Sequence, residues 1–167
     1  EKKFFLLTLH RPANVDDPAN LEHLLKTIMS CTGNLPVVFP VHPRTKKILD
    51  NIGFQNDRLV LAEPMAYLEF IYLVKNALAI ITDSGGITEE ATVLGIPCMT
   101  MRDSTERPET VTMGTNELIG TAPEKLVPYL DKVMQGNWKK GAIPPMWDGH
   151  TAERIIEKLT ELYTPGK

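Results

Sequence analysis

Cysteine, basic charge and long apolar runs are all scarce in this chain of 167 residues. Its two cysteines, Cys31 and Cys98, have neither the spacing of a metal site nor that of a disulfide framework, so we expect a reducing, cytoplasmic compartment and no bound metal. A formal net charge of -3 argues against a nucleic-acid partner. No apolar run approaches the roughly 20 residues that span a bilayer, so we expect no membrane partner.

Several catalytic signatures are missing as well. No lysine follows the glycines at positions 85 and 86 in the Walker spacing, which argues against a P-loop nucleotide hydrolase. The sequence also lacks a G-x-S-x-G elbow, an H-E-x-x-H helix and a paired C-x-x-C motif, which argues against serine hydrolases and zinc enzymes. We therefore expect no cofactor.

Apolar segments typical of strands alternate along the chain with segments of helical spacing. We expect strands at residues 3–9, 36–41, 58–62, 77–82, 97–101 and 116–119, and helices at residues 18–31, 43–52, 67–75, 84–94, 123–134 and 150–163. This alternation predicts an α/β fold, a Rossmann-like parallel sheet of about six strands with helices on both faces. The length and the 43% hydrophobic content predict that residues 1–167 form a single domain. Because the chain enters a strand at once and has no initial Met, we expect it to be a piece of a longer protein.

The segment from Thr82 to Glu90 is the most informative, because it joins an apolar strand to the start of a helix. The backbone N–H groups of Ser84, Gly85 and Gly86 would be unpaired at the positive end of the helix dipole, which is typical of a phosphate site. Glycine there would permit close approach of a ligand and a positive φ. Glu90, one turn later, suits sugar hydroxyls. We interpret the segment as a nucleotide or nucleotide-sugar site; the alternative is an ordinary strand-to-helix turn.

Polar residues follow the other strands at the same expected edge of the sheet, where parallel sheets bind ligands. They include His10, His42, Arg102 and Arg107, and together they favour a polyanionic ligand. Each has a plainer alternative: His10 could bond a backbone carbonyl, His42 could cap a loop, and Arg102 could be structural. Arg107 could form a surface ion pair with Glu106 or Glu109.

These loops resemble one family, the non-hydrolysing UDP-N-acetylglucosamine 2-epimerases, in order and spacing over nearly the whole chain. The matching motifs are Thr8-x-His10-Arg11-x-x-Asn14, Pro40-Val41-His42-Pro43, Asp83-Ser84-Gly85-Gly86-Ile87-x-Glu89-Glu90, Gly95-x-Pro97, Arg102-x-x-Thr105-Glu106-Arg107-Pro108-Glu109, Gly114-Thr115-Asn116-x-Leu118-x-Gly120 and Asp148-Gly149-x-x-Ala152-x-Arg154-Ile155. One departure is Ala13, which stands where the family often has glutamate.

The resemblance implies a two-domain GT-B architecture, of which this chain would be the C-terminal half. The family interconverts UDP-GlcNAc and UDP-ManNAc by eliminating UDP across C1–C2 of the sugar and adding it back, without a cofactor. The N-terminal half, with the acid and base carboxylates, would be absent here, and the full-length protein is expected to be a cytoplasmic homodimer that serves cell-surface polysaccharide synthesis. Three alternatives stay open: a hydrolysing 2-epimerase, the donor domain of a GT-B glycosyltransferase, and a binding module without activity.

The resemblance also implies a role for individual residues. His10 would be catalytic and would hold the diphosphate together with the Ser84-Gly85-Gly86 amides. Glu90 would bind the ribose hydroxyls, and the segment ending at Phe70 would meet the uracil. Arg107 would contribute on the phosphate side. Further possible contacts are Arg11, His42, Met65 and Arg102.

Overall fold

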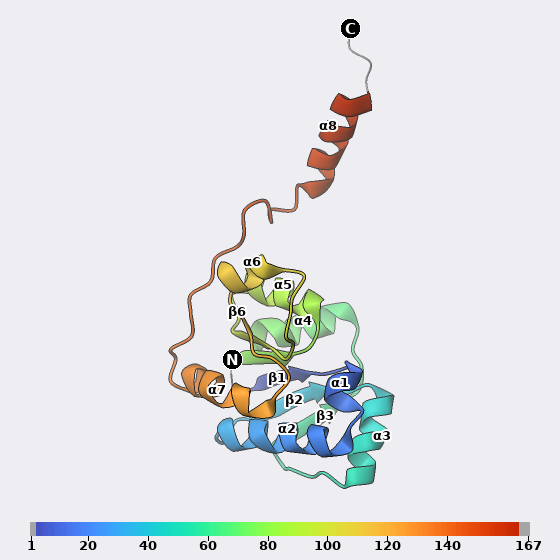
Figure 1. Cartoon of the computed structure of the whole chain (residues 1–167), viewed down its shortest axis with the longest axis vertical. Coiled ribbons are helices and arrows are strands. Elements are labelled where there is room, and N and C mark those ends of the chain that lie inside the picture. The colour runs from blue at the N-terminus through green and yellow to red at the C-terminus, as the bar shows by residue number, and fades with distance from the viewer. Residues whose placement is uncertain (1–2, 164–167) are drawn as a thin grey trace.

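The computed structural model describes residues 3–163, which form a six-stranded parallel sheet with helices on both faces (Figure 1). The strands are β1 (Phe5–Thr8), β2 (Val37–Pro40), β3 (Leu59–Ala62), β4 (Ala79–Thr82), β5 (Cys98–Thr100) and β6 (Asn116–Leu118), in the order β3-β2-β1-β4-β5-β6. The helices are α1 (Pro12–Val15), α2 (Pro18–Cys31), α3 (Pro43–Ile52), α4 (Tyr67–Asn76), α5 (Gly85–Leu94), α6 (Pro108–Thr112), α7 (Val127–Met134) and α8 (Thr151–Tyr163), with a 3₁₀ turn at Pro123–Leu126. The predicted Rossmann-like sheet is confirmed.

The two central strands explain why the sheet forms where it does. All four residues of β4 are buried, and the first three residues of β1 are fully buried, as expected of strands covered on both faces. The two strands pair in register from Phe5 opposite Ala79 to Thr8 opposite Thr82. The strand order reverses between them, because the chain moves outward from β1 to β3 and then returns to the other side of β1. Such a switch point is where open α/β sheets bind ligands.

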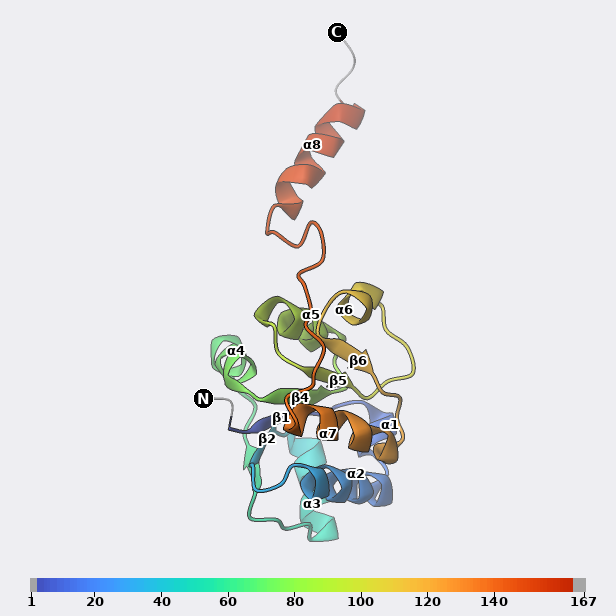
Figure 2. The same ribbon diagram turned by 90° about the vertical axis from the view of Figure 1, so that its left-hand side faces the viewer.

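The helices pack in two layers because alternate strand residues point to opposite faces of the sheet. Phe5 and Leu7 face the core formed with α2, α3 and α7, whereas Leu6 faces the smaller core formed with α4 and α5. Helix α5 ends at Gly95, whose φ of +67° is a left-handed conformation that favours glycine. The two views in Figures 1 and 2 show α2 and α7 on one side of the sheet and α4 and α5 on the other.

Two short helices were not predicted, α1 after β1 and α6 after β5. Both begin at a proline that fits the first turn of a helix, but four or five residues are too few to show a helical period. The helix expected at 123–134 is a 3₁₀ turn followed by α7. Strand β1 is shorter than the apolar run that predicted it.

Helix α8 confirms the expected C-terminal helix but lies away from the sheet, at the end of a long extended segment (Figures 1 and 2). None of its residues is buried. Ile155, Ile156, Leu159 and Leu162 are all about half or more exposed, so the helix carries an apolar face with no contact on the sheet. Within residues 3–163, no helix combines the length and apolar character needed to cross a bilayer.

Candidate functional site at the carboxyl edge of the sheet

A crevice of about 250 Å³ lies at the carboxyl ends of β1, β2 and β4, at the switch point. It is lined by Thr8, Leu9, His10, Pro40, His42, Pro64, Phe70, Ser84 and Ile87. The sequence predicted four of these side chains for the site: His10, His42, Phe70 and Ser84. They lie far apart in the sequence, and the fold brings them together in this crevice. The lining combines polar and apolar side chains, which suits a ligand with both an anionic and an aromatic part.

The N-terminus of α5 opens into this crevice. Ser84 is the N-cap residue, and its side chain makes no capping bond. Its backbone N–H is already taken, because it donates to the Thr82 hydroxyl at 3.0 Å. The predicted anion cradle is therefore reduced to the first-turn amides of Gly85 and Gly86, which have no partner four residues back in the helix, together with the Ser84 hydroxyl.

The expected positive φ at these glycines is wrong. Neither Gly85 nor Gly86 is among the residues with positive φ, because both lie in the first turn of a right-handed helix. What distinguishes them is space. A Cβ on Gly86 would meet no atom within 4 Å, whereas one on Gly85 would lie 3.4 Å from Arg102 Nη1. Gly86 thus leaves the approach to the amides open.

Asp83, the residue before this turn, connects the two central strands. It is fully buried and accepts hydrogen bonds from the backbone N–H groups of His10 at 3.1 Å and Arg11 at 2.9 Å, and from Asn14 Nδ2 at 3.0 Å. Its Oδ1 also lies 2.8 Å from His10 Nδ1. The predicted carbonyl partner of His10 is therefore replaced by a buried carboxylate.

Arg102 and Glu106 form a bidentate pair beside the cradle, with N–O distances of 3.0 and 2.7 Å. Arg102 is buried, and its hydrogen bonds lower the pKa of Glu106 to about 2. The structural role that was the alternative for Arg102 is therefore confirmed, because its pair with Glu106 holds the loop after β5 next to Gly85.

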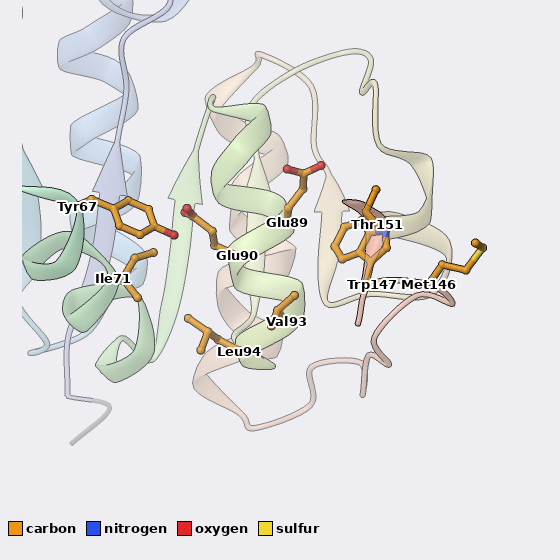
Figure 3. A pocket seen from close by; sticks show the side chains of 9 residues that line it. All are labelled: Tyr67, Ile71, Glu89, Glu90, Val93, Leu94, Met146, Trp147 and Thr151. Atoms are coloured by element: carbon orange, nitrogen blue, oxygen red, sulfur yellow. The ribbon is translucent and has the colours of Figure 1, made fainter. Parts of the chain in front are cut away.

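Glu90 faces the hydroxyl of Tyr67 across the groove between α5 and α4 (Figure 3). Burial is the main cause that raises the pKa of Glu90; the hydrogen bond from Tyr67 lowers it in part, and the charge of Glu89 raises it. The charge of Glu90 in turn raises the pKa of Tyr67. Both residues line a pocket of about 480 Å³ that also includes Ile71, Glu89, Val93, Leu94, Met146, Trp147 and Thr151.

Comparison with known proteins decides the family. A sequence model of the family described as UDP-N-acetylglucosamine 2-epimerase matches residues 1–160. The chain belongs to this family. It is 42% identical over 166 residues to the UDP-N-acetylglucosamine 2-epimerase of Methanocaldococcus jannaschii, with 94% of this chain and 44% of the relative covered. It is also 42% identical over 164 residues to the UDP-2,3-diacetamido-2,3-dideoxy-D-glucuronate 2-epimerase of Pseudomonas aeruginosa, with 95% of this chain and 45% of the relative covered.

A solved structure gives the same result for the epimerase fold. The Methanocaldococcus jannaschii UDP-GlcNAc 2-epimerase in complex with UDP-GlcNAc and UDP superimposes with a TM-score of 0.78 at 42% identity, and the match covers 95% of this chain and 45% of that chain. This chain therefore spans about half the length of the epimerases it matches.

The structure places the other predicted contacts of this epimerase-family chain, Arg11, His42 and Met65, in different surroundings. Arg11 Nε donates to the backbone carbonyl of Asp83 at 3.1 Å. His42 caps α3 through Nδ1, which accepts from the N–H of Arg44 at 3.3 Å, so its plainer alternative is confirmed while it also lines the crevice. Met65 lies apart, in a depression with Leu68, Glu69, Tyr72 and Leu73.

Arg107 is exposed and forms its ion pair with Glu89 of α5. The expected partners, Glu106 and Glu109, were wrong: the contact with residue 106 is only to its backbone carbonyl, at 3.3 Å. The hydrogen bond that Arg107 donates to Glu89 is the main cause that raises the pKa of Arg107. Exposed pairs of this kind contribute little to stability.

Sequence reasoning missed two residues at this epimerase-family site, Asp83 and Tyr67. A carboxylate at the end of a strand that is otherwise buried was a usable signal for Asp83, because buried acids need fixed donors. Tyr67 gave no comparable signal, since its partner Glu90 lies on another helix. Within residues 3–163, no cluster of three His, Cys, Asp or Glu side chains has metal-binding geometry.

The Arg102–Glu106 pair makes a testable prediction in acid. In Arg102→Gln, the pKa of Glu106 is expected to rise from about 2 toward its ordinary value of 4.5, because the bidentate bonds are lost. Since folding depresses this pKa, the contribution of Glu106 to stability is present above pH 4.5 and is lost as the pH falls toward 2. A carboxyl-carbon NMR titration measures the shift. An unchanged Glu106 titration in Arg102→Gln would contradict the assigned pair.

Proposed function

We propose that this chain is the UDP-binding half of a UDP-N-acetylglucosamine 2-epimerase that interconverts UDP-GlcNAc and UDP-ManNAc. The observation that carries the proposal is the meeting of His10 with the open N-terminus of α5 in one crevice at the switch point of the sheet. An N-terminal helix dipole, two free amides and an imidazole are suited to a diphosphate. The bound UDP-GlcNAc and UDP of the Methanocaldococcus jannaschii structure support the same ligand class.

The remaining parts of UDP find matching surfaces nearby. The Glu90 carboxylate can accept hydrogen bonds from ribose hydroxyls, and the hydroxyl of Tyr67 would fix its orientation. Phe70 and Ile87 form an apolar wall for the uracil. We propose these contacts on the resemblance to the family and on the positions of the side chains, with Phe70 and Ile87 in the crevice and Glu90 and Tyr67 in the pocket between α4 and α5.

We propose that this half stabilises the leaving group. When the C1–O bond of the sugar breaks, its electron pair and negative charge remain on the diphosphate of UDP. The amides of Gly85 and Gly86, with a protonated His10, would stabilise that charge most strongly as it develops, which lowers the barrier. Re-addition of UDP at C1 uses the same groups in reverse.

The proton transfers at C2 of the sugar need other groups. No carboxylate is among the described residues that line the crevice. We propose that the acid and base are supplied by the N-terminal half of a two-domain GT-B protein, with residues 1–167 as its second domain. This chain covers 44% of the length of its Methanocaldococcus jannaschii relative, which supports this arrangement. The apolar face of α8, which has no partner on the sheet, supports it as well.

We further propose a cytoplasmic homodimer that serves cell-surface polysaccharide synthesis, both from the family resemblance. The matches give no support to a hydrolysing enzyme or a glycosyltransferase. The Pseudomonas aeruginosa relative, which is equally similar, is named for another UDP sugar. Both names contain UDP, so the proposal is better supported for the nucleotide than for the sugar.

The isolated chain is expected to bind UDP weakly and to produce no UDP-ManNAc. Calorimetry with UDP measures the binding, and proton NMR of UDP-GlcNAc incubated with the chain measures the turnover. Uridine is the matched control, because it keeps the base and ribose but lacks the diphosphate. Equal affinity for uridine and UDP would contradict the diphosphate site. Enzyme-like turnover by this chain alone would contradict the proposal that the acid and base belong to the N-terminal half.

A further inference from the structure

We propose that Asp83 is a positioning residue for His10, which it holds with Nδ1 protonated and Nε2 presented to the bound diphosphate. The proposal deepens the UDP site described above and rests on it. It assigns a role to a residue that is fully buried and is not among those that line the crevice.

The geometry around Asp83 leaves its carboxylate one orientation. Oδ2 accepts from the N–H of Arg11 at 2.9 Å and from Asn14 Nδ2 at 3.0 Å, so it is held toward α1. Oδ1 is then directed at the imidazole, 2.8 Å from His10 Nδ1. The N–H of His10 donates to both oxygens at 3.1 Å. A carboxylate with no exposed surface and with these donors has no room to rotate.

The chemistry of the pair follows from the donor inventory. A carboxylate only accepts hydrogen bonds, so Nδ1 of His10 carries a proton in both the neutral and the charged ring. Nε2 is then an acceptor in the neutral ring and a donor in the imidazolium. A diphosphate oxygen also only accepts, so the imidazolium is the form of His10 that can donate to it from Nε2. The carboxylate of Asp83 accepts from Nδ1 of that ring and so directs Nε2 toward the crevice as the donor.

Three other charged or titratable side chains, those of Arg11, His42 and Arg102, lie near the pair of His10 and Asp83. Arg11 lies beside His10 and donates to the backbone carbonyl of Asp83. His42, from the loop after β2, lines the same crevice and accepts from the N–H of Arg44. Arg102, from the loop after β5, interacts with the charge of Asp83 but makes its hydrogen bonds to Glu106. Within residues 3–163, the carboxylate paired with His10 is that of Asp83.

The first test needs no ligand. Long-range ¹⁵N–¹H NMR of the imidazole, recorded above the pH at which histidine loses its charge, is expected to show His10 protonated on Nδ1 and bare on Nε2. The Nε2-protonated tautomer, which is the commoner form of free histidine, would overturn the proposal even if the chain bound UDP. Because this measurement is independent of UDP, it separates a failure of this inference from a failure of the proposed function.

The second test is a double-mutant cycle with UDP-GlcNAc. Asp83→Asn is expected to weaken binding about tenfold at pH 6, the scale of one charge-assisted hydrogen bond, and to shift the pH dependence of binding to lower pH. In the His10→Ala background, the same substitution is expected to change affinity by about twofold or less. Equal losses in both backgrounds, with an unchanged pH profile, would show that Asp83 only supports the loop and would overturn the proposal.

Asp17→Asn is the matched control. It makes the same substitution in a carboxylate that accepts backbone N–H bonds, those of Ala19 and Asn20 at the start of α2, and Asp17 does not line the crevice. We expect the tautomer to be retained and UDP-GlcNAc affinity to stay within about twofold of the parent. If Asp83→Asn did not fold, the tautomer of the parent would still decide the role of Asp83; an Nε2-protonated ring in the parent would overturn it.

Discussion

Gly86→Val is expected to abolish measurable UDP binding while leaving the chain folded. Gly86 is the second residue of α5, and a Cβ there meets no protein atom within 4 Å, so the valine side chain would cost little in packing. The same space is the approach to the free amides, and a branched side chain in it would keep phosphate oxygens beyond hydrogen-bond distance. Calorimetry with UDP and a thermal melt measure the two parts of the prediction.

Ala19→Val is the matched control, because Ala19 is the exposed second residue of a different helix, α2. It adds the same branched bulk at the same helix position and is expected to leave UDP affinity unchanged. Gly85→Val is a less clean probe, since its Cβ would crowd Arg102. A folded Gly86→Val protein that bound UDP as tightly as the parent would show that the diphosphate site lies elsewhere.

UDP-GlcNAc affinity is expected to fall as the pH rises across the neutral range, because the charged imidazole of His10 can donate to the diphosphate and the neutral one cannot. His10 reaches the crevice with Nδ1 engaged by Asp83, so only a protonated ring can donate from Nε2 to the diphosphate. His10→Ala is expected to flatten the profile and to weaken binding most at low pH. UDP-GlcNAc is preferred to UDP because a terminal phosphate itself titrates near pH 6.

His42→Ala is the control for this profile. His42 lines the same crevice, but its Nδ1 accepts from the N–H of Arg44, so the ring is committed to capping α3. The parent's slope is expected to remain largely intact in this variant. Identical pH profiles for the parent and His10→Ala would refute a charged contact between His10 and the diphosphate.

The fold could be predicted from the sequence because its signals are local. Three such signals are the fully buried run of β4, the proline at the start of α2 and the glycine that ends α5, and each acts within a few residues. Helices α1 and α6 escaped prediction because they are too short to have a period. The place of α8 also escaped it, since amphipathic spacing predicts a helix but not the surface that the helix meets.

The site was predictable only in part. That His10 and Ser84 share an edge follows from the rule for parallel sheets, and the structure brings them together. Three side-chain contacts were not predictable. They are the hydrogen bond from the Ser84 amide to Thr82, the ion pair of Arg107 with Glu89 and the contact of Glu90 with Tyr67. Each depends on side-chain rotamers that packing selects, and no spacing in one sequence encodes that choice.

The exposed apolar face of α8 has a consequence for how order is distributed along the chain. A helix of 13 residues gains little stability from its own backbone, and α8 receives none from burial on the sheet. Its helicity is therefore tied to whatever surface covers Ile155, Ile156 and Leu159. We expect α8 to become stably helical as it packs against that surface. The spectroscopic signal of helix in this segment would then report the assembly.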